Sequence, residues 1–268
     1  MSVQKLFVIK YGGNAMVDAA LMAAVAEDIV SLRRAGTGLV LVHGGGPEIE
    51  KQLAAQNIES RFVDGLRYTD EAVMDVVQMV LCGKINKNIV ALLQSKGGAA
   101  LGLCGIDGAI LKARRETRAN LGLVGNIEDV NAPLLHSLVD NGLIPVISPV
   151  AIGLGADSGR ALNVNADTAA AMIAARLGAA ELVLMTDIAG LLRDVHDPQS
   201  LISQISAFEL AGLKNNGIIC GGMIPKVEGC ITAINYGVRK VRIIDGRIPH
   251  VLRRSFCQGE CYGTLIAA

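Results

Sequence analysis

Short runs of apolar residues recur along the chain, and each is followed closely by glycine, proline or aspartate. Such runs, rich in β-branched residues and leucine, are typical of strands that are buried on both faces. They predict strands at residues 5–11, 38–43, 143–148, 181–186 and 241–245.

Amphipathic stretches lie between these runs, with apolar residues at the three- and four-residue spacing of one helix face. They predict helices at residues 18–34, 47–56, 70–95, 167–177 and 225–236. Strand followed by helix, repeated, is typical of a parallel sheet with right-handed crossovers, whose ligands bind beyond the carboxyl ends of the strands. The pattern therefore predicts an α/β fold around a mainly parallel sheet.

The segment 109–131 breaks this alternation, because it is polar and carries Gly122 and Gly125. It predicts β-hairpins rather than a helix. Its basic residues fit either an anion-binding patch or a solvated hairpin face, and we expect the second. These residues are Lys112, Arg114, Arg115 and Arg118.

Composition narrows the class of protein. Hydrophobic residues make up 51% of the 268 residues, which excludes a disordered chain. Lys and Arg number 25 against 25 Asp and Glu, and aromatics reach only 3%, so a basic surface for nucleic acid is not expected. We find no leader-like or membrane-spanning pattern, and the six cysteines lack C-x-x-C spacing. We expect a cytoplasmic protein with reduced thiols.

A glycine pair follows the first predicted strand. Lys10, Gly12 and Gly13 would place an ammonium group and free backbone N–H groups at a helix start. That combination binds phosphate or carboxylate oxygens, and a tight turn with a surface lysine is the alternative.

A glycine triplet follows the second predicted strand. Gly44 to Gly46 carry no side chains, so a ligand can approach the main chain, and Pro47 suits the first turn of the next helix. We expect His43, before the triplet, to be structural rather than a base. Arg67 precedes a long helix and suits two-pronged capture of a carboxylate, although a solvated arginine fits as well.

Polar residues precede two later helices. Asn163, Asn165 and Asp167 exceed what one helix cap requires, so we expect them to bind a ligand or a lysine as well. Asp187 ends a buried strand and is a candidate neighbour of a ribose or adenine. Lys226 follows a glycine pair at a helix start.

Together these residues suggest phosphoryl transfer, which depends mainly on positioning and charge stabilisation. A carboxylate acceptor is already ionised at neutral pH, so the reaction would need no general base. Walker A and dinucleotide-binding glycine patterns are missing from the sequence.

The motifs also resemble those of a known family. I-K-Y-G-G-N-A-M, V-H-G-G-G-P, G-L-R-Y-T-D, N-V-N-A-D, T-D-I-A-G-L and G-G-M-I-P-K-V occur in the order typical of acetylglutamate kinases, which belong to the amino-acid kinase family. The resemblance runs from residue 5 to 264. It implies a three-layer αβα sandwich forming one domain over 1–268. An acceptor-binding lobe would span about 1–160, with a β-hairpin lid near 109–131, and a nucleotide-binding lobe about 161–268.

The resemblance also implies a reaction and residue roles. The reaction is ATP-dependent phosphorylation of the side-chain carboxylate of N-acetyl-L-glutamate, the second step of arginine biosynthesis. Lys10 and Lys226 would neutralise the transferred phosphoryl group, and Asp167 would orient both. Mg²⁺ would accompany ATP without protein ligands. The phosphate would be bound by Gly12, Gly13 and Gly45. The acceptor would be bound by Gly45, Gly46, Arg67, Asn163 and Asn165. The nucleotide would be bound by Asp187, Gly190, Leu191, Leu192, Ile218 and Ile219.

Two departures bear on assembly. Arginine-inhibited members carry an extra helix before the first strand and a glutamate five residues after a C-terminal histidine. Here the first predicted strand starts near Lys5, and the residue five positions after His250 is Ser255 instead of a glutamate. The resemblance therefore implies a homodimer that arginine does not inhibit. Two alternatives stay open: a kinase of this fold acting on another small acceptor, and a non-catalytic module that binds ATP or an amino acid.

Overall fold

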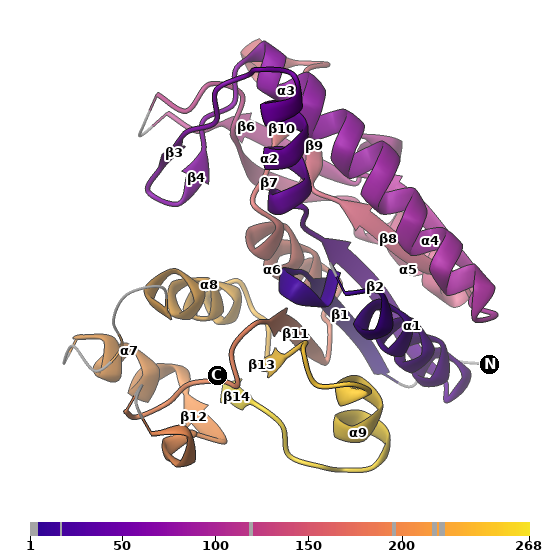
Figure 1. Ribbon diagram of the computed structural model, residues 1–268, viewed down its shortest axis with the longest axis vertical. Coiled ribbons are helices and arrows are strands. Elements are labelled where there is room, and N and C mark those ends of the chain that lie inside the picture. The colour runs from indigo at the N-terminus through magenta and orange to yellow at the C-terminus, as the bar shows by residue number, and fades with distance from the viewer. Residues whose placement is uncertain (1–4, 17, 118–119, 195–196, 216–218, 220–222) are drawn as a thin grey trace.

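A computed structural model describes residues 5–16, 18–117, 120–194, 197–215, 219 and 223–268 (Figure 1). An eight-stranded, mainly parallel sheet runs through the molecule in the order β12-β14-β13-β11-β1-β2-β8-β5. Among the described strands of this sheet, β14 and β13 form the one antiparallel pair. The strands are β1 (Lys5–Tyr11), β2 (Thr37–His43), β5 (Ala100–Cys104), β8 (Ile144–Ser148), β11 (Glu181–Thr186), β12 (Gln204–Ser206), β13 (Lys240–Asp245) and β14 (Thr264–Ala267).

The five predicted strands form the inner part of this sheet, and the structure confirms each of them to within about one residue at either end. The first strand, β1, lies between β11 and β2. Its central residues Val8 and Ile9 are both fully buried. Burial on both faces explains the continuous apolar runs, because alternate side chains of each strand enter opposite layers.

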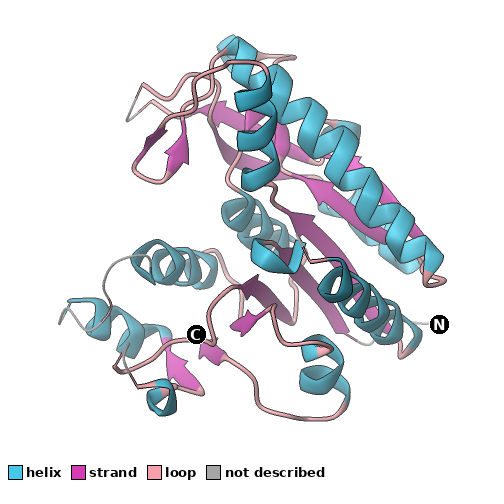
Figure 2. Cartoon of the chain, viewed as in Figure 1, coloured by secondary structure: helices cyan, strands magenta, loops and turns pink. Residues whose placement is uncertain are grey.

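Helices cover both faces of the sheet (Figure 2). On one face α1 (Ala19–Arg34), α4 (Asn86–Ser95) and α9 (Val251–Cys257) pack on Ile9 and its neighbours. The other face, which includes Val8, contacts α5, α6 and α8. The predicted three-layer sandwich is therefore confirmed. The helices of this second layer are α5 (Ala132–Asp140), α6 (Ala166–Arg176) and α8 (Met223–Asn235). Two further helices are α2 (Gly46–Ala55) and α7 (Ala207–Asn215).

The helix predicted at 70–95 is one helical run with a change of winding. It comprises α3 (Glu71–Gln78), a π-helical turn η2 (Met79–Ile85) and α4. Among the described residues this run is the one stretch long and apolar enough to cross a membrane. Val73, Leu81 and Leu93 on its inner side are buried in the two cores, so the same pattern fits a helix packed on a sheet.

A second sheet of four strands lies at one end of the main sheet, in the order β10-β9-β6-β7. The predicted hairpin at 109–131 is confirmed as the antiparallel pair β6–β7, although residues 107–109 form a 3₁₀ turn instead. The strands are β6 (Leu111–Arg115), β7 (Gly125–Val130), β9 (Val150–Gly153) and β10 (Ala161–Asn163); a separate hairpin joins β3 (Phe62–Val63) to β4 (Leu66–Arg67).

The basic residues of β6 are paired with carboxylates. Lys112 contacts Asp129, Arg114 contacts Glu128, and Arg115 contacts Asp157. An anion-binding patch is therefore not supported for these three residues, in agreement with the expectation of a solvated hairpin face. Arg118, which belonged to the same prediction, lies outside the described residues.

Candidate active site

The ammonium group of Lys10 meets a carboxylate at the end of β1. Its Nζ lies 3.1 Å from Oδ1 of Asp167 in the first turn of α6. The side chain of Lys10 is 14% exposed and that of Asp167 is 42% exposed. Asn165 caps α6, because its Oδ1 accepts hydrogen bonds from the N–H groups of Asp167 and Thr168. The cap fixes the start of the helix and so holds Asp167 beside the lysine.

The glycines beside Lys10 lie close to charged side chains. A Cβ at Gly12 would lie 2.7 Å from Lys10 Nζ. Gly13 has a φ of +70°, and a Cβ there would lie 2.5 Å from Oδ1 of Asp187. The ends of β1 and β11 therefore meet here, and bare backbone lies next to the lysine that points into the site.

The glycine triplet after β2 lies against the π-helical turn. A Cβ at Gly45 would collide with the side chains of Leu81 and Ile85. Gly46 has open space around it, and Pro47 occupies the first turn of α2, as predicted. The triplet thus presents unobstructed main chain on the side away from Leu81 and Ile85.

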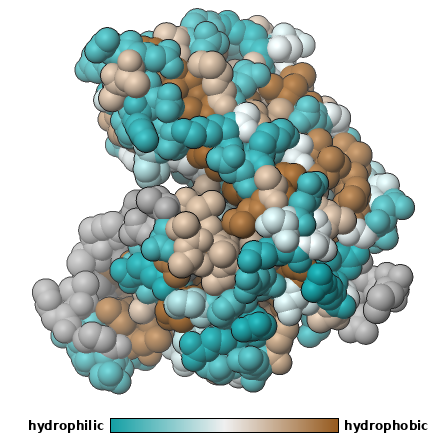
Figure 3. Space-filling view, turned by 45° about the vertical axis from the view of Figure 1, so that its right-hand side comes forward, coloured by the Kyte–Doolittle hydropathy of each residue, from teal (hydrophilic) through white to brown (hydrophobic). Residues whose placement is uncertain are grey.

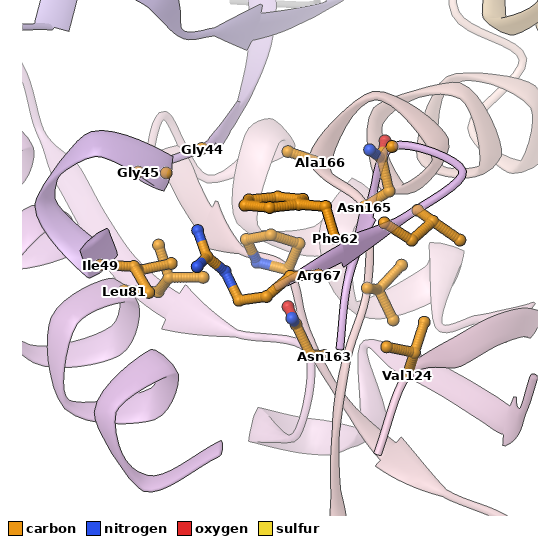
Figure 4. Close-up of a pocket in the computed structure, with 15 residues that line it drawn as sticks. Gly44, Gly45, Ile49, Phe62, Arg67, Leu81, Val124, Asn163, Asn165 and Ala166 are labelled. Atoms are coloured by element: carbon orange, nitrogen blue, oxygen red, sulfur yellow. The ribbon is translucent and has the colours of Figure 1, made fainter. Parts of the chain in front are cut away.

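A cavity of about 160 Å³ lies next to this triplet (Figure 4). Its walls come from α2, the β3–β4 hairpin and the segment before α6, and include an apolar portion formed by Phe62 and Val124. All the residues predicted to bind the acceptor line it: Gly45, Gly46, Arg67, Asn163 and Asn165.

Arg67 is held firmly at this cavity. It is 8% exposed, and its Nη1 donates hydrogen bonds of 2.6 Å to both Glu50 Oε1 and Ser60 Oγ. Ser60 Oγ in turn donates to Glu50 at 2.9 Å. The guanidinium also lies 4.7 Å from the ring centre of Phe62. The alternative of a solvated arginine is therefore wrong, and Glu50 and Ser60 are site residues that sequence reasoning missed.

A larger cavity of about 620 Å³ adjoins the first and shares the glycine triplet with it. Lys10, Gly12, Gly13 and Asp167 line it. Lys226 lines two further cavities, of about 20 and 390 Å³, and Asp167 lines both of these as well. Asp167 therefore faces the surroundings of both lysines, although they lie on β1 and α8. Figure 3 shows the surface hollowed between the upper and lower parts of the molecule.

Four of the residues predicted to bind nucleotide follow the end of β11 directly in the chain: Asp187, Gly190, Leu191 and Leu192. Gly190 has a φ of +146°, and Leu191, which is 2% exposed, donates its N–H to Thr264 Oγ1 at 2.8 Å. Leu191 thus fixes this loop to β14. Leu192 is half-buried, and Ile219 is buried. Ile218 lies outside the described residues.

His43 is structural, as expected. It is fully buried; its Nδ1 contacts Gly44 O at 2.9 Å, and Asn86 donates to its Nε2 at 3.2 Å. Burial lowers the pKa of His43 to about 4. The ring is therefore neutral at pH 7, with Nδ1 donating to the carbonyl and Nε2 accepting.

Lys10 contacts Asp167, Lys226 lines two cavities together with Asp167, and bare backbone lies at the ends of parallel strands, which is the arrangement expected of a kinase of the amino-acid kinase type. The model of the amino acid kinase family matches residues 5–245, so the chain belongs to this family. Within it the chain groups with the acetylglutamate kinases. It is 50% identical over 263 residues to that of Clostridium kluyveri, covering 98% of this chain and 92% of the relative.

Other relatives agree. The acetylglutamate kinase of Clostridioides difficile is 47% identical over 262 residues, with 98% of this chain and 91% of the relative covered. Among solved structures, N-acetylglutamate synthase from Neisseria gonorrhoeae gives a TM-score of 0.84 at 24% identity, covering 98% of this chain and 59% of that one. Carbamate kinase from Giardia lamblia gives 0.72 at 19%, covering 100% and 99%. These two structures bear on the fold alone.

Proposed function

We propose that this kinase phosphorylates the side-chain carboxylate of N-acetyl-L-glutamate with ATP, the second step of arginine biosynthesis. Identity of about half the residues to acetylglutamate kinases over nearly the whole chain supports this substrate. The observation that carries the chemistry is the contact of Lys10 with Asp167 beside the bare backbone of the glycine loops.

An acceptor carboxylate oxygen attacks the γ-phosphorus of ATP, the bond from that phosphorus to the bridging oxygen breaks, and ADP leaves. Negative charge spreads over the transferred group, and Lys10 and Lys226 lower its energy. The N–H groups of Gly12, Gly13 and Gly45 donate to the same oxygens. No general base is required, which agrees with the neutral, buried ring of His43.

Arg67 is proposed to bind the α-carboxylate of the acceptor, with Asn163 and Asn165 as further donors. Its Nη1 is engaged by Glu50 and Ser60, which leaves the rest of the guanidinium fork to grip a carboxylate. The cavity lies between this arginine and the glycine triplet. An acceptor anchored at one carboxylate would therefore present its other carboxylate to the backbone N–H groups.

Asp187, Gly190, Leu191, Leu192, Ile218 and Ile219 are the proposed nucleotide contacts, in a lobe of about 161–268. Among the described residues no group of three or more His, Cys, Asp or Glu is arranged to hold a metal ion. The Mg²⁺ that we propose to accompany ATP would be held largely by the phosphates and by water.

The segment 109–131 remains our proposed lid. Its residues Leu121 and Leu123 are linked to the segment after β4, because Thr69 N–H donates to Leu121 O at 3.0 Å and Leu123 N–H donates to Thr69 O at 2.6 Å. Movement of these two residues would therefore be transmitted to the segment that follows Arg67.

The decisive experiment measures ADP release from ATP with N-acetylglutamate, glutamate, aspartate and carbamate. We expect turnover with N-acetylglutamate, its loss in Lys226→Ala, and its retention in the control Lys240→Ala, whose lysine is exposed at the start of β13. Turnover only with another acceptor would establish the alternative kinase. Binding of ATP without turnover on any acceptor would establish a regulatory module.

Assembly and location follow the same proposal: a cytoplasmic homodimer that arginine does not inhibit. Size-exclusion chromatography with light scattering, run with and without arginine, tests whether the protein is a homodimer. The ADP assay tests whether arginine inhibits it. A hexamer, or inhibition at millimolar arginine, would contradict the proposal.

A further inference from the structure

Two cysteines far apart in the sequence meet at the edge of the main sheet. Cys104 is the last residue of β5, and Cys82 lies in the π-helical turn η2. Cys104 is paired in register with Ser148 of the neighbouring strand β8. Ser148 Oγ donates to the sulfur of Cys82 at 3.3 Å. Since register partners in parallel strands project to the same face, the three side chains converge.

The two thiols interact directly. They lie close enough to share a hydrogen bond between their sulfurs. That bond, together with the backbone groups of Ile106 and Asp107, lowers the pKa of Cys104 to about 7. The pKa of Cys82 is raised, chiefly because its proton is shared with Cys104 and because it is buried. The lowered pKa favours the thiolate of Cys104, which is the reactive form.

Access distinguishes this pair from Cys230. Cys82 and Cys104 are both half-buried, whereas Cys230 is fully buried on α8 and its pKa is raised to about 12 by burial. A small oxidant can therefore reach the pair, and the product of its attack on one sulfur would lie next to a second thiol.

We propose that Cys82 and Cys104 form a reversible dithiol–disulfide site that hydroperoxides oxidise. The Cys104 thiolate attacks the outer oxygen of the hydroperoxide, the O–O bond breaks, and the leaving alkoxide or hydroxide takes up a proton. Cys104 is now a sulfenic acid. The Cys82 sulfur then attacks the Cys104 sulfur, the S–S bond forms, and water leaves with the proton of Cys82. Two electrons pass from the thiols to the peroxide.

The site adjoins the wall of the acceptor cavity. Leu81, next to Cys82, and Ile85, one turn later, are the side chains that contact Gly45. A covalent link from Cys82 to β5 would fix the π-helical turn from its other side and shift these two side chains. We therefore expect oxidation to raise the KM for N-acetylglutamate by about fivefold, a typical coupling between sites. This consequence rests on the proposed function, whereas the disulfide itself does not.

The test treats the full-length protein with hydrogen peroxide, blocks the remaining thiols by alkylation, and maps the digest by mass spectrometry. We expect a linked pair of peptides carrying Cys82 and Cys104, lighter by two hydrogen atoms and separated again by dithiothreitol. The double variant Cys257→Ser, Cys261→Ser, which lacks the two exposed thiols near the C-terminus, should give the same link. Mapping the unaltered protein makes the result independent of whether any variant folds.

Other outcomes overturn the proposal. A Cys104 sulfinic acid with Cys82 still alkylated would show that Cys82 does not resolve the sulfenic acid, and alkylation of both would show that the pair is not oxidised. The coupling is tested with the Cys257→Ser, Cys261→Ser protein: its KM should rise on oxidation and return on reduction, and a further Cys82→Ser change should abolish the response. An unchanged KM for N-acetylglutamate in protein that carries the Cys82–Cys104 disulfide would refute the coupling to the acceptor cavity. The proposed function is tested separately by the ADP assay.

Discussion

Arg67 and Glu50 are joined by an ion pair of 2.6 Å, and the arginine is 8% exposed. The pair links the β3–β4 hairpin to α2, and both elements contribute residues to the lining of the candidate acceptor cavity. A long side chain loses conformational entropy when it binds a ligand, and an arginine that is already fixed loses less of it. Glu50 therefore acts as a positioning residue for Arg67.

Glu50→Gln removes the charge but keeps an oxygen that can accept from Arg67. We expect the KM for N-acetylglutamate to rise by about threefold in Glu50→Gln and about tenfold in Glu50→Ala. We expect kcat to stay nearly constant, because Arg67 would bind the acceptor equally in the ground state and in the transition state. Steady-state kinetics checks this, with Glu59→Gln as the control at a nearby exposed glutamate. A fall in kcat with an unchanged KM would assign Glu50 a different role.

Lys10→Ala removes one of the two proposed positive charges from the transferred phosphoryl group. We expect kcat to fall by about 10³-fold, because a donor aimed at the developing charge of the transition state contributes on this scale. Asp167→Asn should lower kcat too, since the amide no longer attracts either lysine. Circular dichroism confirms folding, and single-turnover kinetics isolates the chemical step. A single-turnover rate within a factor of about three of the unaltered enzyme would exclude Lys10 from transition-state stabilisation.

Gly45→Ala adds a methyl group where Leu81 and Ile85 already lie. We expect the side chains or the loop to shift, with a loss of about 1–3 kcal/mol in stability and a raised KM for the acceptor. Gly83→Ala is the matched control, because a Cβ at Gly83 meets nothing within 4 Å. Urea denaturation and steady-state kinetics measure the two effects. Equal behaviour of the two variants would mean that this contact does not shape the cavity.

His43 gives the protein a specific dependence of stability on pH. Its pKa is about 4 in the folded protein because it is buried, and about 6.5 in an unfolded chain. Between these values the unfolded state binds more protons, so stability is present above about pH 6.5 and is lost as the pH falls towards 4. When the pH falls from about 7 to about 5, we expect proton uptake by His43 in the unfolded chain to lower the free energy of unfolding by about 2 kcal/mol.

Urea denaturation at both pH values tests this contribution. His43→Gln should remove most of the His43 part of the change, although it also costs stability at pH 7 through lost packing. His136→Gln, at an exposed histidine of α5, should retain the dependence of the unaltered protein. The same slope in all three proteins would show that His43 does not titrate as its burial implies.

The inner strands were predictable because burial on both faces leaves continuous apolar runs such as that of β1. The sequence pattern did not reveal β3, β4, β9 and β10, which have two to four residues each and are too short to show a period. Edge strand β5 was also missed, because Gly102 interrupts its short apolar run. The π-helical turn has no signature in the amphipathic pattern, which continues through it.

The candidate site was predictable wherever glycine or a cap marked a strand end, as at Gly13 and Asn165. Glu50 and Ser60 are polar residues on or near a solvent-facing helix, and nothing in their local sequence signals a partner at Arg67. Cys82 and Cys104 are about 22 residues apart in the sequence, and Ser148 links them, because it is the register partner of Cys104 and contacts the sulfur of Cys82. Such contacts depend on tertiary packing rather than on local propensity.

Val8 and Ile9 enter opposite core layers, and Lys10 is the next residue of the same strand. A slip of β1 by one residue against β2 and β11 would exchange the two layers and place the ammonium among apolar side chains. Both cores resist that slip at once. The packing of the two hydrophobic layers therefore fixes the position of β1 in the sheet. The position of β1 in turn fixes how far the ammonium group of Lys10 lies from the core.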